Sequence, residues 1–161
     1  MKHGIFYGSH DVTLDSKNRV SVPSEIRKCI DKERDGEAFF LIVGINRKIW
    51  LYTERMYEEM ASQQISEMVP GDDALAMDQI WYGQADKVAW DPAGRILIPD
   101  KILRKTGTGK EVSIVGLRNH CEIWNRADWA AREEELDRQK VEISLRAKQI
   151  GHAPAATPLL R

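Results

Sequence analysis

The chain has 161 residues, 42% hydrophobic and 30% charged, and a formal net charge of −1 at pH 7. This balance is typical of a folded globular protein and argues against a nucleic-acid binder that relies on overall positive charge. The longest apolar runs are too short to span a membrane, and the N-terminus does not resemble a signal peptide. Cys29 and Cys121 are expected to be buried, reduced thiols of a cytoplasmic protein.

In the first half of the chain, alternating strands precede helical segments. In chain order we expect strands at 12–14 and 20–22, a short helix at 23–29, strands at 38–44 and 48–53, and helices at 54–65 and 73–82. A tight turn separates the first two strands, and the next two read as a second hairpin. Thr53 is a suitable N-cap for the helix that follows it.

The second half repeats this order. We expect strands at 84–90 and 95–98 as a hairpin, a short helix at 99–105, strands at 111–116 and 122–124, and a long helix at 129–150. Prolines and alanines mark residues 151–161 as a mobile tail.

One ten-residue pattern occurs twice. Residues 14–23 and 90–99 both contain Asp, then Arg four residues later, then Pro four residues after that. The two copies lie 76 residues apart. The chain therefore reads as two versions of one half, which we place at residues 5–82 and 83–150.

Each copy of the pattern predicts a tight turn. In the second copy Asp91 can accept backbone hydrogen bonds, Pro92 presets φ, and Gly94 can adopt the left-handed conformation that returns the chain. In the first copy Asp15 has the same place and Asn18 replaces the glycine. Asn is the non-glycine residue that this conformation tolerates best.

Arg19 and Arg95 begin the strands that leave the two turns, and Lys17 lies inside the first turn. Arg can pair bidentately with guanine O6 and N7 in the major groove, which admits a two-stranded ribbon, or it can bind phosphate. The turns could thus recognise an anionic partner. The alternative is that each Asp and Arg form a structural ion pair that stiffens a tight hairpin, and duplication alone does not decide between the two.

Residues 14–23 with Ile26 and Arg27, residues 91–99, and the later strands at 112–116 and 122–124 closely resemble the MraZ family over residues 5–145. The resemblance implies an α+β fold of two AbrB-like, swapped-hairpin β-barrel halves with flanking helices, in a single compact domain of two pseudo-repeats. It also implies a ring-shaped homo-oligomer.

The family consists of bacterial transcriptional regulators that bind G-rich direct repeats upstream of the division and cell-wall gene cluster, including their own promoter region. The resemblance therefore implies a cytoplasmic, nucleoid-associated protein whose Lys17, Arg19 and Arg95 face double-stranded DNA. The chain departs from the family pattern at Asn18, where Gly is usual, in a slightly extended N-terminus, and in the tail after Gln149.

Other functions find less support in the sequence. No catalytic set or cofactor fingerprint is evident, so we expect no enzyme, cofactor or small-molecule substrate. The four histidines and two cysteines lack metal-ligand spacing. The main alternative is an antitoxin-like interaction module, in which the charged C-terminal helix binds a protein partner.

Overall fold

The computed structural model of the chain describes residues 4–64 and 68–151. Its contacts divide the chain into two compact units, residues 1–126 and residues 127–161. Both halves of the repeat contribute strands to the first unit, and the second unit contains most of the long helix. Residues 152–161 of the tail lie outside the described residues, so their mobility stays a prediction, as does the boundary placed after residue 82.

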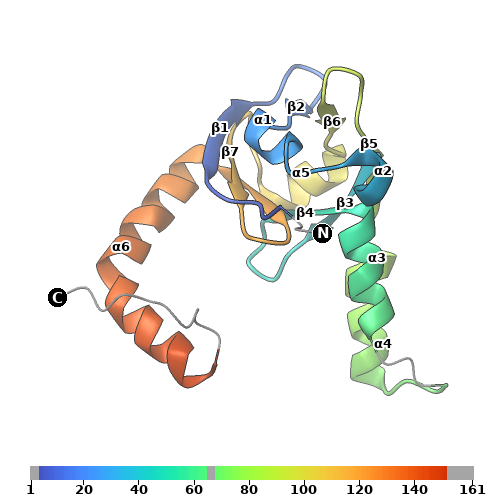
Figure 1. The fold of residues 1–161 in the computed structure, drawn as a ribbon, viewed down its shortest axis with the longest axis vertical. Helices are drawn as coiled ribbons and strands as arrows, with labels where there is room; N and C mark the ends of the chain where they lie inside the picture. The colour runs from blue at the N-terminus through green and yellow to red at the C-terminus, as the bar shows by residue number, and fades with distance from the viewer. Residues whose placement is uncertain (1–3, 65–67, 152–161) are drawn as a thin grey trace. The chain divides into compact units, whose positions relative to one another are not determined.

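The elements follow the expected order, with one short addition, α2, and with the helix expected at 73–82 divided into α4 and the π-helix η1 (Figure 1). They are β1 (Ser9–Thr13), β2 (Arg19–Ser21), α1 (Ser24–Arg27), α2 (Lys32–Asp35), β3 (Ala38–Val43), β4 (Ile49–Thr53), α3 (Glu54–Gln63), α4 (Asp72–Asp78), the π-helix η1 (Gln79–Gly83), β5 (Asp86–Ala89), β6 (Arg95–Leu97), α5 (Asp100–Thr106), β7 (Glu111–Gly116), β8 (Cys121–Asn125) and α6 (Arg126–Gln149).

The two halves exchange strands. The main sheet has six antiparallel strands in the order β1-β7-β8-β4-β3-β5, and β2 and β6 form a separate two-stranded ribbon. Strand β1 of the first half pairs with β7 of the second, whereas β5 of the second half pairs with β3 of the first. The ribbon also takes one strand from each half. This is the swapped arrangement that the family resemblance implies.

The hairpins expected from residues 12–14 with 20–22 and from residues 84–90 with 95–98 do not form. Strands β1 and β2 flank a tight turn but pair with β7 and β6, and β5 and β6 likewise pair with β3 and β2. The alternating pattern specifies a buried face for each strand but not its partner. Among the described strands, hydrogen bonds do not join the ribbon to the sheet, so the barrel is not closed.

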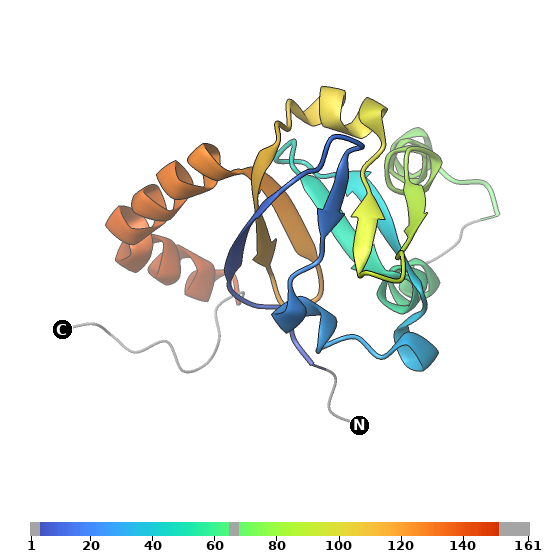
Figure 2. The ribbon, with the colours of Figure 1, turned by 90° about the horizontal axis from the view of Figure 1, so that it is seen from above.

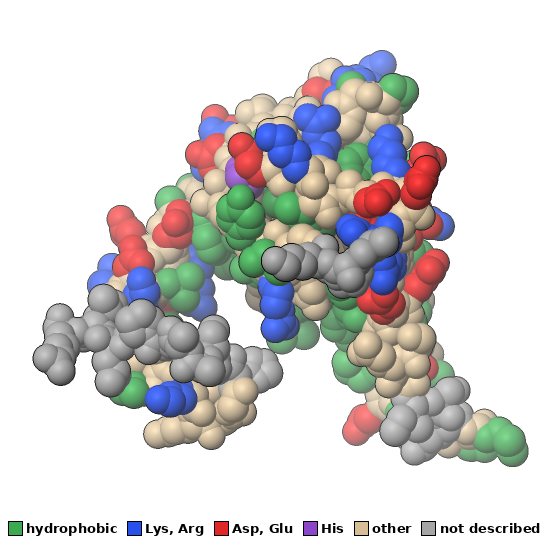
Figure 3. Space-filling view, viewed as in Figure 1, with side chains coloured by type: hydrophobic (Ala, Val, Ile, Leu, Met, Phe, Trp, Pro, Cys, Tyr) green, Lys and Arg blue, Asp and Glu red, His purple; other side chains and the backbone are tan. Residues whose placement is uncertain are grey.

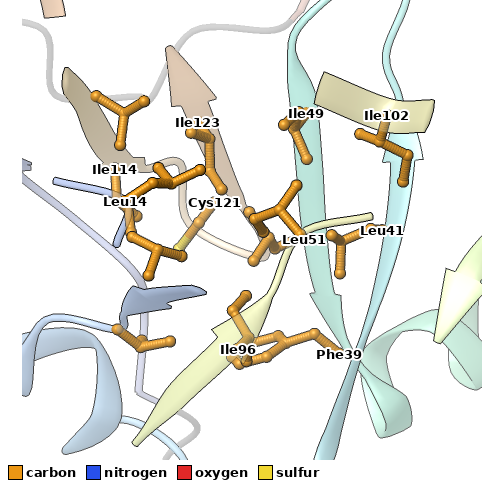
Figure 4. Packing of buried hydrophobic residues seen from close by; sticks show 14 of the residues in the cluster. Leu14, Phe39, Leu41, Ile49, Leu51, Ile96, Ile102, Ile114, Cys121 and Ile123 are labelled. Atoms are coloured by element: carbon orange, nitrogen blue, oxygen red, sulfur yellow. The ribbon is translucent and has the colours of Figure 1, made fainter. Parts of the chain in front are cut away.

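The hydrophobic core lies between the ribbon and one face of the sheet (Figure 4). Val20 and Ile96, the central residues of the two ribbon strands, are 0% and 1% exposed. Sheet residues such as Leu41 and Ile123 pack against them, and Ile102 of α5 belongs to the same cluster. Because neighbouring side chains alternate along a strand, the residues on either side of Val20 and Ile96 point away from the core.

A second hydrophobic cluster is formed by the residues of β3 and β4 that alternate with those of the main core. Phe39 faces the main core, whereas Phe40 stacks on Tyr57 of α3 with ring centroids 4.4 Å apart. Trp81 of η1 packs edge-on to Trp50 of β4 and belongs to this cluster. No helix within residues 4–64 or 68–151 combines the length and apolarity needed to cross a membrane.

Candidate nucleic-acid interface

The two Asp-x-x-x-Arg turns have the same hydrogen bonds. In the first turn, Asp15 Oδ1 accepts from the backbone N–H groups of Lys17 at 2.8 Å and Arg19 at 2.9 Å. In the second, Asp91 Oδ1 accepts from the backbone N–H groups of Ala93 and Arg95, both at 2.9 Å. Each carboxylate thus bridges the N–H groups of its own turn and holds the loop closed.

The tips adopt the left-handed backbone conformation that the sequence predicts. Asn18 has φ of 61° and Gly94 has φ of 76°. The N–H of each donates to the carbonyl oxygen of the turn's Asp, both at 3.0 Å. Asn18 therefore replaces glycine without changing the backbone of the turn, but it adds a polar side chain at the tip.

Each arginine pairs with the aspartate of its own turn. Arg19 Nε donates to Asp15 Oδ2 at 2.8 Å, and Arg95 Nε donates to Asp91 Oδ2 at 2.7 Å. The side chains of Arg19 and Arg95 remain 33% and 34% exposed. The structural ion pair that the sequence left open is therefore present, and it holds each guanidinium by its Nε edge.

The turns lower the pKa of both aspartates. The backbone N–H of Arg19 is the main cause for Asp15, and with the Lys17 N–H and the Arg19 side chain it lowers the pKa to about 2. The pKa of Asp91 is lowered chiefly by the backbone N–H of Arg95. Both carboxylates therefore stay ionised and keep their turns closed at neutral pH.

The ribbon brings both arginines onto one surface. Arg19 pairs with Leu97 and Ser21 pairs with Arg95 in the antiparallel register. Because Val20 and Ile96 point into the core, these four neighbours share the outward face. Arg95 Nη1 also lies 3.9 Å from Asp15 Oδ2, an ion-pair distance between the two halves.

The two turns lie at opposite ends of this ribbon (Figure 2). The N–H of Val22 donates to the carbonyl oxygen of Gly94 at 3.0 Å, and the N–H of Ile98 donates to that of Asn18 at 2.9 Å. Each tip thus adjoins the residue that follows the other half's strand. One exposed face, which we call the ribbon face (residues 15–19, 21, 91–95 and 97), therefore presents both turns together.

Two further basic residues contact the turns. Lys110 Nζ donates to the side-chain oxygen of Asn18 at 2.8 Å and to the carbonyl oxygen of Asp15 at 3.1 Å. Arg27 lies so close to Gly94 that a Cβ there would be 2.6 Å from Arg27 Nη1. Both contacts have a partial signal in the sequence, because Lys110 ends a stretch rich in Lys and Arg (residues 87–110) and Arg27 follows the first copy of the repeated pattern.

Basic and acidic side chains are mixed over the unit of residues 1–126 in the view of Figure 3. Among the described residues, the turns and the two side chains that contact them carry five basic groups and two carboxylates. The basic groups are Lys17, Arg19, Arg27, Arg95 and Lys110. This local excess can attract an anion although the net charge of the whole chain is −1.

Within the part of the chain that the structure describes, no group of three or more His, Cys, Asp or Glu side chains is arranged to hold a metal ion. Cys121 is buried and Cys29 is partly buried, and both are free thiols. Burial raises the pKa of the Cys121 thiol to about 12.

A strand-exchanged fold that sets two copies of one Arg-bearing turn on a single ribbon defines a duplicated protein of the swapped-hairpin class. The family model described as "MraZ protein, putative antitoxin-like" matches residues 5–78 and 81–149. The chain belongs to the MraZ family, which confirms the resemblance seen in the sequence.

The relatives bear the name "Transcriptional regulator MraZ". The protein of Dictyoglomus thermophilum is 30% identical over 149 residues, 91% of this chain and 98% of its own length. That of Neisseria gonorrhoeae is 28% identical over 147 residues, 90% of this chain and 97% of its own. That of Mycoplasma mobile is 28% identical over 120 residues, 74% and 79% of the two chains. The name is that of a class of regulators rather than of enzymes.

Proposed function

We propose that the chain is a sequence-specific DNA-binding transcriptional regulator of the bacterial division and cell-wall gene cluster. It reads G-rich direct repeats in its own promoter region, and it works as a ring-shaped homo-oligomer in the cytoplasm, at the nucleoid. The observation that carries this proposal is the pair of guanidinium groups, Arg19 and Arg95, on one exposed ribbon face. The names of the relatives support the regulatory role.

The geometry of each arginine supports readout of guanine. The aspartate holds the guanidinium through Nε. Among the described residues, the Nη groups of Arg19 and Arg95 donate no hydrogen bond, so they can meet O6 and N7 on the major-groove edge of guanine. Because the ion pair already restricts the side chain, less conformational entropy is lost when DNA binds. The Asp–Arg pair thus stabilises the turn and also holds the arginine side chain in position before DNA binds.

Repetition supplies the affinity that one turn lacks. A good bidentate pair with guanine discriminates by about 1–3 kcal/mol. Subunits of a ring can engage neighbouring boxes on one DNA, and linkage of this kind raises avidity by about 10²–10⁴ without new contacts. A chain of net charge −1 can therefore bind DNA tightly when several copies act together.

Substitution of the first arginine tests the proposal. We expect Arg19→Ala to abolish the electrophoretic shift of a duplex from the region upstream of the gene, while the fold and the assembly size are kept and the melting temperature falls only slightly, because one partly exposed ion pair is lost. Lys17→Ala is the matched control, since Lys17 is exposed on the same turn. It should weaken binding to every duplex alike and reduce the salt slope by about 1, as expected for one lost phosphate contact.

A shift of normal strength with Arg19→Ala would refute the reading of guanine by this turn. A change of base preference with Lys17→Ala would show that Lys17 does more than contact phosphate. Upstream DNA without evenly spaced G-rich boxes would contradict the proposed operator.

A further inference from the structure

We propose that Lys110 is a positioning residue that orients the Asn18 amide toward DNA and so gives the first turn a base preference that the second turn lacks. This inference rests on the proposed function, since it concerns the same ribbon face. It starts from a contact between residues 92 positions apart in the chain.

The position of Lys110 is fixed by the strand exchange. Its carbonyl oxygen accepts from the N–H of Leu14 at 2.8 Å, directly beyond the register in which β1 pairs with β7. From this anchored backbone, Nζ reaches both Asn18 Oδ1 and the Asp15 carbonyl oxygen. The second half of the chain therefore supports the turn of the first half.

The chemistry of the contact decides which way the amide of Asn18 points. A lysine ammonium has three donors and no acceptor, so only the oxygen of the amide can face it. The NH₂ group of Asn18 is then the part of the side chain that remains to meet DNA. Two N–H donors at the tip match an acceptor on the major-groove edge of a base, such as O6 or N7 of guanine or O4 of thymine.

The second turn has no equivalent side chain. Gly94 occupies its tip with φ of 76°, and Arg27 fills the space into which a Cβ would project. In the second turn only Arg95 is left to contact a base, whereas the first turn combines Arg19 with the oriented amide of Asn18. The two halves are thus alike in backbone but different in what they can distinguish.

The test compares two duplexes in fluorescence anisotropy with the full chain: the region directly upstream of the gene and a scrambled duplex of equal composition. We expect Lys110→Met to lower the ratio of the two affinities by up to about tenfold, the value of one hydrogen bond between the Asn18 amide and a base. Asn18→Gly should cause a similar loss. The double variant should lose no more than either single variant, because both remove the same oriented amide.

Lys105→Met is the control for charge, since Lys105 is an exposed lysine of α5. It should weaken binding to both duplexes equally and leave their ratio unchanged. Asn18→Gly gives the first turn the tip residue of the second, so it still tests the inference if Lys110→Met lowers the melting temperature.

The inference is overturned if Lys110→Met behaves like Lys105→Met, or if the losses from Asn18→Gly and Lys110→Met multiply. Its failure can be told apart from failure of the proposed function by Arg19→Ala. If Arg19→Ala abolishes the preference and Lys110→Met does not, only the role of Lys110 is refuted. If Arg19→Ala keeps the preference, or the unmodified chain shows none, both are refuted.

Discussion

At the scale of single residues, Asp15 links the stability of the ribbon face to its charge. One oxygen of the carboxylate accepts two backbone N–H groups, and the other accepts Arg19 Nε. Protonation would weaken all three bonds, because a neutral carboxyl is a poorer acceptor. The turn should therefore open in acid before the core does.

The lowered pKa of Asp15 defines the pH range in which the carboxylate stabilises the fold. Because the pKa falls from 3.8 to about 2 on folding, the carboxylate contributes stability that is fully present above 3.8 and is lost as the pH falls through 2. We expect Asp15→Asn to be less stable than the unmodified chain at pH 7, and the difference in unfolding free energy to close between about pH 4 and pH 2. Urea denaturation at a series of pH values measures it.

Asp137→Asn, on an exposed position of α6, makes the same chemical change away from any turn and is the matched control. It should not reproduce the pH-dependent difference. A gap between the unmodified chain and Asp15→Asn that stays constant down to pH 2 would show that the carboxylate does not act through its charge.

At the scale of elements, the two-stranded ribbon divides its residues between the fold and the interface. Ile96 is 1% exposed and belongs to the core, whereas the next residue, Leu97, is 51% exposed on the ribbon face. Ile96→Ala should lower the unfolding free energy by about 2–5 kcal/mol, the usual cost of an Ile-to-Ala change in a core. Leu97→Ala should change it by less than about 0.5 kcal/mol.

Chemical denaturation of the two variants side by side measures this contrast. Because the residues are neighbours on one strand, any general effect on the ribbon backbone is common to both. Equal losses of stability would mean that the ribbon face is covered in the folded protein, which would contradict its role as an open surface.

Structure set by neighbouring residues could be predicted from the sequence, whereas the pairing of distant strands could not. The turns could be predicted because Asp, Pro and Gly or Asn act within five residues, and the N-cap of Thr53 was equally local, with its side chain accepting from the Met56 N–H. The partners of β1, β2, β5 and β6 could not be predicted from alternation alone, since each strand has an apolar face that several partners would bury. Only the family resemblance indicated the exchange.

In the candidate site, too, residues within one turn could be predicted from the sequence, whereas contacts between distant residues could not. Arg19 and Arg95 follow directly from the repeated pattern, and the structure places both on one ribbon. The contact of Lys110 with Asn18 depends on β7 lying beside β1, so no local pattern could reveal it. The short helix α2, which Asp31 caps by accepting from two backbone N–H groups, was missed because its four residues are all charged and show no apolar periodicity.

At the scale of the whole molecule, strand exchange makes each half depend on the other. In residues 1–82 alone, β1 and β2 would have no partner strands and Val20 would lose Ile96 from its side of the core. A domain of this size would also be only marginally stable by itself. The unit of residues 1–126, in contrast, contains every strand of both sheets.

We therefore expect that neither fragment, 1–82 or 83–161, folds as a monomer, and that an equimolar mixture recovers the strand exchange because each supplies the partners the other lacks. Circular dichroism with analytical ultracentrifugation measures folding and mass together. Residues 1–126, which keep both halves, are the control and should unfold cooperatively without α6. Cooperative unfolding of a monomeric 1–82 fragment would show that the first half is an independent domain and that the exchange is not needed for its stability.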